Sequence, residues 1–217
     1  MIVFSKKILK ITNANEMYNT NTKVGYKPYV TTSKFNSIGT TTVITDWKTG
    51  RGVHCLSQGE ALWYYILRWD DDNINIQEQF PLEMDIINII FEQLGMPKIK
   101  NPKFVMSTDF LVTKKDGSKI AYYVKNDRNL NERTLQLLTV EKIYWVTQNV
   151  EYKLLFKDNA NKVLANNIRL IVEFYNPESV VDDMSRIKHL LATKKVTADL
   201  SSRILDMNYL DELGLIE

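Results

Sequence analysis

The chain has 217 residues, of which 44% are hydrophobic and 25% charged, the proportions of an ordinary folded protein. Its net charge of +2 neither demands nor excludes a nucleic-acid partner, and its single cysteine, Cys55, excludes an internal disulfide framework. The longest apolar run, residues 86–91, is too short to span a bilayer, and no secretory signal is recognisable. We therefore expect a cytoplasmic protein with no membrane partner.

Residues 1 to about 50 are polar, rich in Thr and Asn, and punctuated by turn-forming glycines. Two stretches, residues 26–29 and 46–51, interleave aromatic side chains with cations. Cations favour phosphate contact and exposed rings favour base stacking, so we predict DNA contacts at Lys27, Lys48 and Arg51. A loop that covers the core explains the same composition equally well.

A helix is predicted to begin at Ser57 and to continue through the largely apolar residues 61–67. Glu60 stands three residues after Ser57, which is the spacing of a capping box. In that motif the glutamate accepts hydrogen bonds from the start of its own helix. A capping role and a catalytic role therefore explain Glu60 equally well.

Alternating hydrophobicity and turn residues define the next elements. In chain order they are a strand over 74–80, a helix over 82–96, strands over 104–113 and 119–124, a helix over 131–145 and a strand over 150–156. A strand, a hairpin, a helix and a further strand predict an α/β core with a mixed sheet.

Asp109 lies on the first strand of the hairpin, and Lys125 follows the second strand. A two-residue turn would place these two side chains on opposite faces. A three-residue loop over 115–117, with its glycine left-handed, places Asp109 opposite Tyr123 and Lys125 diagonally on the same face. Both loops suit the sequence, and only the longer one brings Asp109 and Lys125 together.

The character of the chain changes after residue 157, since no strand is evident beyond it. Helices are predicted over about 163–172, 180–192 and 198–207. We therefore predict two domains, an α/β domain over 1–157 and a small helical domain over 158–217.

An acid on a helix, Glu60, an acid on a strand, Asp109, and a lysine on the partner strand, Lys125, form the set that a metal-dependent nuclease needs. Mg²⁺ usually takes one or two carboxylates and keeps several waters. Glu60 and Asp109 are thus sufficient side-chain ligands, with the carbonyl of Val124 as a third, and Mn²⁺ is expected to substitute. Lys125 would orient or help to deprotonate the attacking water.

The order of helix glutamate, strand aspartate, hairpin and lysine resembles the PD-(D/E)XK nuclease superfamily. More narrowly, several runs resemble TnsA, the endonuclease subunit of heteromeric Tn-seven-type transposases. The runs are residues 26–29, 47–51, the helix with Glu60, and residues 78–82, 108–112, 124–125 and 141–145. The resemblance implies a restriction-endonuclease-like catalytic domain over 1–157, with Glu60, Asp109 and Lys125 as its site, and a winged-helix-like domain over 158–217.

The resemblance also implies an activity, which is Mg²⁺-dependent cleavage of the 5′, non-transferred strand at each transposon end. The implied partners are double-stranded DNA, a DDE transposase subunit that cuts the 3′ ends, and an AAA+ ATPase regulator that binds the C-terminal domain. One departure is Tyr123, which stands two residues before Lys125, where the superfamily usually has Glu, Asp or Gln. A tyrosine does not ligate Mg²⁺ as a carboxylate does. A non-catalytic DNA-binding adaptor of the same complex and a stand-alone restriction-type nuclease are therefore the alternatives.

Overall fold

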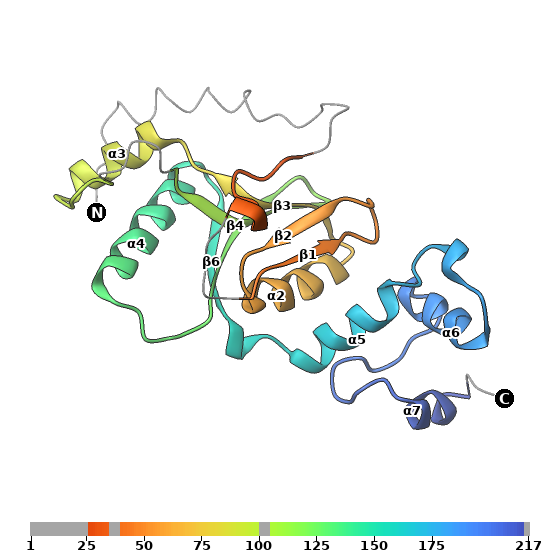
Figure 1. Cartoon of the computed structure of the whole chain (residues 1–217). Helices are drawn as coiled ribbons and strands as arrows, with labels where there is room; N and C mark the ends of the chain where they lie inside the picture. The colour runs from red at the N-terminus through yellow and green to blue at the C-terminus, as the bar shows by residue number, and fades with distance from the viewer. Residues whose placement is uncertain (1–25, 35–39, 100–104, 215–217) are drawn as a thin grey trace. The chain divides into compact units, whose positions relative to one another are not determined.

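The computed structural model describes residues 26–34, 40–99 and 105–214 (Figure 1). The chain divides into two compact units, each made of two stretches of sequence. Met1–Thr31 and Ile74–Leu155 form the first, here called the four-strand unit, and Thr32–Asn73 and Phe156–Glu217 form the second, the helix-rich unit. One division point lies close to the predicted boundary after residue 157, whereas residues 32–73 group with the C-terminal stretch. The two-domain division at 157 stays a prediction.

The four-strand unit contains one sheet with the order β3-β4-β5-β6 and two helices. The strands are β3 (Asn73–Pro81), β4 (Ser107–Lys114), β5 (Lys119–Lys125) and β6 (Glu151–Phe156), and the helices are α3 (Met84–Gln93) and α4 (Glu132–Thr147). All six correspond to predicted elements. The mixed α/β fold of the restriction-endonuclease-like class is thereby confirmed.

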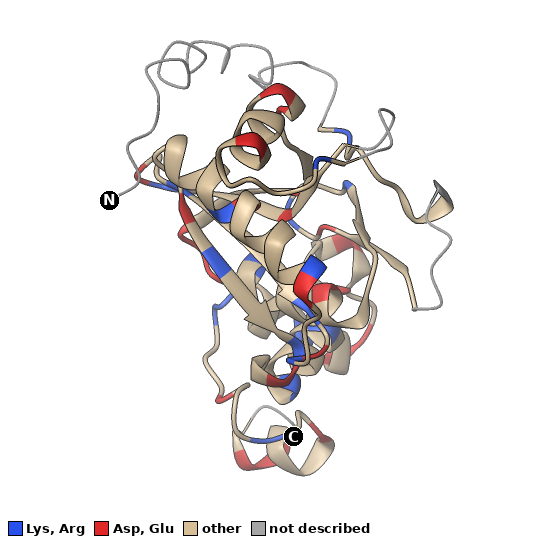
Figure 2. Ribbon diagram, turned by 90° about the vertical axis from the view of Figure 1, so that its left-hand side faces the viewer, with Lys and Arg blue, Asp and Glu red and all other residues tan. Residues whose placement is uncertain are grey.

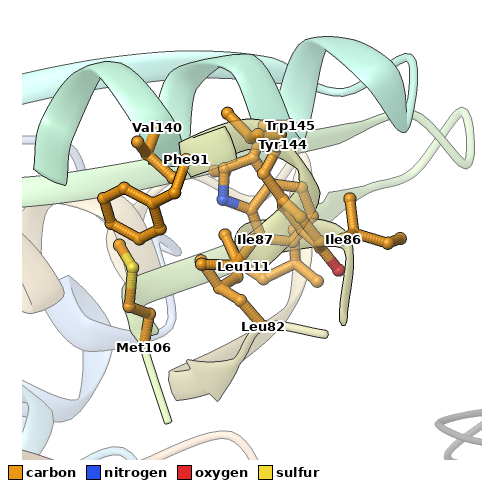
Figure 3. Close-up of a cluster of buried hydrophobic side chains, with 11 residues drawn as sticks. Leu82, Ile86, Ile87, Phe91, Met106, Leu111, Val140, Tyr144 and Trp145 are labelled. Carbon is orange, nitrogen blue, oxygen red and sulfur yellow. The ribbon is translucent and has the colours of Figure 1, made fainter. Parts of the chain in front are cut away.

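A buried apolar cluster joins α3, α4 and the β4–β5 hairpin (Figure 3). Ile87 and Phe91 are spaced four apart on α3, and Tyr144 and Trp145 come from the last turns of α4. Leu111 contributes from the centre of β4. Fully burying one side chain of this size contributes about 1.5–3 kcal/mol. The cluster therefore fixes the hairpin, and with it Asp109 two residues from Leu111, against the helices.

The hairpin has the three-residue loop that the nuclease interpretation requires. Phe110 pairs with Tyr122 and Thr113 with Lys119. At the turn the amide of Lys114 donates to the carbonyl of Ser118 at 2.9 Å. Gly117 has a φ of 83°, which a glycine adopts without strain. The two-residue turn is thus excluded.

The helix-rich unit contains a two-stranded antiparallel hairpin and four α-helices among the residues that the structure describes. These are β1 (Thr42–Thr45), β2 (Gly52–Cys55), α2 (Gln58–Trp69), α5 (Lys162–Val172), α6 (Asp183–Ala192) and α7 (Met207–Glu212). In this unit α2 packs against α5, and α5 packs against α6. The β1–β2 hairpin was not predicted, although its β-branched residues carried the signal.

The turn between β1 and β2 is built around the buried carboxylate of Asp46. Its Oδ1 accepts from the backbone amides of Lys48 and Thr49 at 2.8 and 3.0 Å. Its Oδ2 accepts from the Tyr64 hydroxyl at 2.7 Å and lies 2.8 Å from Nε of Arg68. The turn is therefore anchored to α2 by a buried network of ion pair and hydrogen bonds.

Trp47, in the same turn, is only 7% exposed and stacks on Tyr65, with ring centroids 6.1 Å apart. The interpretation of this aromatic residue as a base-stacking platform is therefore wrong. Its sequence position beside cations suggested an exposed ring, but α2 covers it.

The predicted helix over 198–207 is also wrong, since α7 begins only at Met207. The cause is Asn167, a buried residue of α5. Its Nδ2 donates to the carbonyls of Leu200 and Arg203 at 2.9 and 2.7 Å, and its Oδ1 accepts from the amide of Leu205 at 2.9 Å. These backbone groups are therefore satisfied by a side chain rather than by helical hydrogen bonds.

Within the described ranges, no helix combines the length and the apolar character that crossing a membrane requires.

Candidate active site

Asp109 lies at the open end of the β4–β5 hairpin, just beyond the pair Phe110–Tyr122. Continuing the same register by one pair places Asp109 opposite Tyr123. Lys125 is two residues further along β5, and side chains two apart on a strand share a face. The structure thus brings Asp109, Tyr123 and Lys125 to one face of the hairpin.

The Asp109 carboxylate is buried, with 8% of the residue exposed, and both of its oxygens accept hydrogen bonds. The amide of Val124 donates to Oδ2 at 2.7 Å. Nε2 of Gln79, from β3, donates to Oδ1 at 3.3 Å. Each carboxylate oxygen has a second lone pair, so neither bond prevents metal coordination.

Lys125 contacts the residue that departs from the superfamily pattern. Its Nζ lies 3.5 Å from the Tyr123 hydroxyl and 4.9 Å from the centre of the Tyr123 ring. Tyr123 thus lies beside the lysine and offers it a ring face and a hydroxyl instead of a carboxylate. A cation above an aromatic ring is held by the quadrupole of that ring.

Behind this face lies a buried chain of hydrogen bonds that the sequence did not predict. Nε1 of Trp145 donates to Oγ1 of Thr108 at 2.7 Å, and Thr108 donates to Oε1 of Glu141 at 2.6 Å. Burial raises the pKa of the Glu141 carboxyl well above its ordinary value. The charge of Asp109 raises this pKa further, whereas the hydrogen bond from Thr108 and the charge of Lys125 partly lower it. Burial thus makes ionisation of Glu141 harder than that of an exposed glutamate.

Glu60 belongs to the other unit and caps its own helix. Ser57, the N-cap of α2, accepts from the amide of Glu60 at 3.2 Å. In return, Oε2 of Glu60 accepts from the amide of Leu56 at 2.8 Å, and Oε1 accepts from the Ser57 hydroxyl at 2.8 Å. Glu60 thus accepts from residues at the start of its own helix, with the Leu56 amide in place of the Ser57 amide that a capping box uses, and its predicted metal role stays a prediction.

The three predicted DNA contacts differ in their surroundings. Lys27 is exposed, in a segment held to β3 by the Tyr26 hydroxyl, which donates to the carbonyl of Glu78 at 2.7 Å. Lys48 pairs with Asp71 at 2.9 Å. Nη1 of Arg51 donates to the carbonyl of Gly52 at 3.2 Å. Figure 2 shows basic and acidic residues interspersed along the ribbon. The DNA-binding roles of these residues stay predictions.

In the described parts of the chain, no three His, Cys, Asp or Glu side chains form a group that could hold a metal ion. The predicted set needs no such group, because it contains two carboxylates and the Val124 carbonyl. Mg²⁺ commonly binds through one or two carboxylates, with waters and substrate phosphate as its other ligands. The Asp109 carboxylate, a hard oxygen donor beside a cationic side chain, fits that chemistry.

The fold and the hairpin face define a class of protein, the restriction-endonuclease-like α/β proteins with an aspartate and a lysine on one face of a sheet hairpin. Residues 70–157 match the family described as TnsA-like endonuclease N terminal. The Transposon Tn7 transposition protein TnsA of Escherichia coli is 33% identical over 177 residues, which are 78% of this chain and 65% of that protein. The resemblance to TnsA is thereby confirmed. The chain covers 65% of the length of that relative.

Proposed function

We propose that this chain is a metal-dependent DNA endonuclease subunit of a transposase. It would cut the 5′, non-transferred strand at the ends of a transposon. The similarity to a transposition protein and to an endonuclease domain supports the general activity. The observation that carries the proposal is the register of the β4–β5 hairpin, because it unites Asp109 and Lys125 on one face.

In this proposal Asp109 and Glu60 hold Mg²⁺ or Mn²⁺, with the carbonyl of Val124 as a further ligand. The metal supplies the positive charge that stabilises the phosphorane and the leaving oxygen. Lys125 orients the attacking water and offsets phosphate charge. Tyr123 keeps the lysine ammonium on this face through its ring and hydroxyl. Lys27, Lys48 and Arg51 contact the DNA backbone, and Lys48 exchanges Asp71 for phosphate when DNA binds.

The proposed partners are those that the resemblance to TnsA implies. The substrate is double-stranded DNA at transposon ends, and a DDE transposase subunit cuts the other strand. An AAA+ ATPase regulator binds the domain formed by residues 158–217. A DNA substrate and a single buried cysteine agree with a cytoplasmic location.

Mapping the cut strand tests this proposal. The purified protein is combined with the DDE transposase subunit of its own element and a duplex that carries a transposon end, labelled on each strand in turn. We expect Mn²⁺- or Mg²⁺-dependent nicking of the 5′ strand, lost when Asp109→Asn replaces the wild type. Nicking that persists with Asp109→Asn would contradict it.

The adaptor function has one observation in its favour, which is that Tyr123 and not a carboxylate faces Asp109. It predicts that the complex needs this chain for assembly while Asp109→Asn changes no cleavage product. The same experiment therefore separates the two functions.

A further inference from the structure

Gln79 has an unusual backbone for a residue within a strand. Its φ is 48°, in the left-handed region that non-glycine residues rarely adopt. Its carbonyl accepts from the amide of Tyr29 at 3.3 Å, and only 3% of the residue is exposed. Strained residues persist where their surroundings hold them, and they cluster at functional sites. A glycine would adopt this φ without strain. The backbone conformation therefore does not explain a glutamine at this position, whereas its side-chain contacts do.

The Gln79 side chain bridges two residues of β4. Its Oε1 accepts from the Ser107 hydroxyl at 3.1 Å, and its Nε2 donates to Oδ1 of Asp109 at 3.3 Å. An ionised carboxylate only accepts hydrogen bonds, so the nitrogen end of the amide has to face Asp109. The oxygen end then faces Ser107, whose hydroxyl donates. The amide orientation is thus defined from both sides.

Together with the Val124 amide, Gln79 holds the Asp109 carboxylate at both oxygens. Two donors from two different strands leave the carboxylate little freedom to rotate. The direction in which the carboxylate faces a ligand is thereby fixed. Hydrogen bonds of this kind orient metal ligands, and their loss typically costs about 10–100-fold in metal affinity or activity.

We infer that Gln79 is a positioning residue, which sets the orientation of Asp109 as a ligand of a divalent metal ion. The strained backbone of β3 brings the amide to the carboxylate. The inference rests on the proposed function and adds to it a residue outside the acid, acid and lysine set.

The chain offers a matched control in Gln77, the same residue type two positions earlier in β3. Gln77 is 5% exposed, close to the 3% of Gln79. It lines a groove of about 440 Å³ with residues such as Phe80 and Trp145, and Asp109 is not among the residues of that groove. Nε2 of Gln77 has no hydrogen-bond partner within the described part of the chain, so Gln77→Met removes a buried amide that donates nothing to Asp109.

The first measurement uses metal-free protein and the side-chain amide signals in ¹⁵N–¹H NMR spectra. The two cross-peaks of the Gln79 side-chain amide are assigned as those that disappear in Gln79→Met. We expect Asp109→Asn to shift them, because the bond to Oδ1 changes, and Asp116→Asn at the exposed hairpin turn to leave them in place. If Asp109→Asn shifted the Gln79 amide signal no more than Asp116→Asn does, the contact between Gln79 and Asp109 would be disproved.

The second measurement is the Mn²⁺ affinity of the full-length protein with a short DNA duplex present. Gln79→Met and Gln79→Gly are expected to lower that affinity about 10–100-fold, and Gln77→Met to leave it unchanged. Gln79→Gly also relieves the positive φ, so its thermal midpoint should not fall below that of Gln79→Met. A merely structural residue would instead cost stability and leave the Mn²⁺ affinity as it was.

The outcomes separate this inference from the proposed function. Folded Gln79 variants that bind Mn²⁺ as tightly as the wild type would overturn the positioning role alone. A wild type that binds no Mn²⁺ would remove the metal-dependent function and the positioning role together, while the NMR measurement would still report the contact.

Discussion

Glu60 and Asp109 are both buried acids predicted as metal ligands, yet their surroundings differ. Both oxygens of Glu60 accept from residues at the start of its own helix, Leu56 and Ser57. Both oxygens of Asp109 accept from other strands, through Val124 of β5 and Gln79 of β3. The first arrangement satisfies a helix end, which any helix needs. The second joins three strands around one carboxylate, through a backbone amide of β5 and a side-chain amide of β3.

Of the two acids, Asp109 supports a catalytic role more strongly than Glu60. The hydrogen bonds from Leu56 and Ser57 to the Glu60 carboxylate lie within four residues of sequence and explain its place at the helix start. Asp109 has no explanation of that local kind, because its two donors come from two other strands. The nuclease proposal therefore depends mainly on Asp109. The proposed metal role of Glu60 needs a separate test.

Asp109→Asn should have the largest effect. We expect loss of metal binding and a fall in cleavage beyond the ~10–100-fold typical of residues that only support a ligand. Asparagine keeps the shape and can still accept from Val124, so the fold should persist. Cleavage of a labelled duplex and thermal unfolding check both parts. Cleavage at the wild-type rate by the folded Asp109→Asn variant would contradict a metal-ligand role of Asp109.

Lys125→Met should lower cleavage by about 10²–10⁴-fold, the range for loss of a proton-transferring or water-orienting group. The Mn²⁺ affinity should stay unchanged, because the lysine is not a ligand. Single-turnover cleavage and Mn²⁺ titration on the same preparation measure the two quantities. Loss of Mn²⁺ binding in this variant would show that Lys125 supports the metal site rather than the reaction.

Asp46→Asn offers a contrast from a purely structural acid. Asp46 pairs with Arg68 in the interior, and removing one partner of a buried ion pair costs about 3–5 kcal/mol. Urea denaturation measures this loss, and Mn²⁺ affinity should not change. A variant as stable as the wild type would show that the pair contributes nothing.

The same acid predicts a pH dependence. Burial by itself would raise the pKa of Asp46, but the hydrogen bond from Tyr64 and the charge of Arg68 leave it lowered overall. A lowered folded-state pKa stabilises the fold above the ordinary aspartate value of about 3.8, and that stability is lost as pH falls further. Denaturation at successively lower pH should show this loss in the wild type and less of it in Asp46→Asn.

Glu60→Ala and Glu60→Gln should have the smallest effect on stability and sharpen the comparison most. Losing a cap interaction costs about 0.5–2 kcal/mol, and glutamine can still cap. We therefore expect Glu60→Ala to be less stable and Glu60→Gln to resemble the wild type. Cleavage lost in the stable Glu60→Gln protein would select the metal role. Cleavage retained there would leave Glu60 as a cap only.

The sequence was sufficient for elements whose cause is local. The Asp116–Gly117 turn and its β-rich flanks predicted the hairpin, and Ser57 with Glu60 predicted the start of α2. It left the hairpin register open, because two loop lengths suit the same residues. The backbone pairing of Lys114 with Ser118 decided that question.

The features that could not be predicted from the sequence depend on contacts between residues far apart in the chain. The contact between Gln79 and Asp109 joins residues 30 apart and depends on a positive φ that no pattern signals. The pair of Asp46 with Arg68 joins residues 22 apart, so no local pattern in the turn over 46–51 signals that Asp46 is buried. These side-chain contacts form only in the folded chain, so the sequence alone does not show them.

The most direct test of the central claim is Mn²⁺ titration of the full-length protein with a short DNA duplex, wild type beside Asp109→Asn. We predict saturable binding by the wild type that is lost in the folded variant. Equal binding by both proteins, or none by either, would contradict a metal site at Asp109 and favour the adaptor function that Tyr123 suggests.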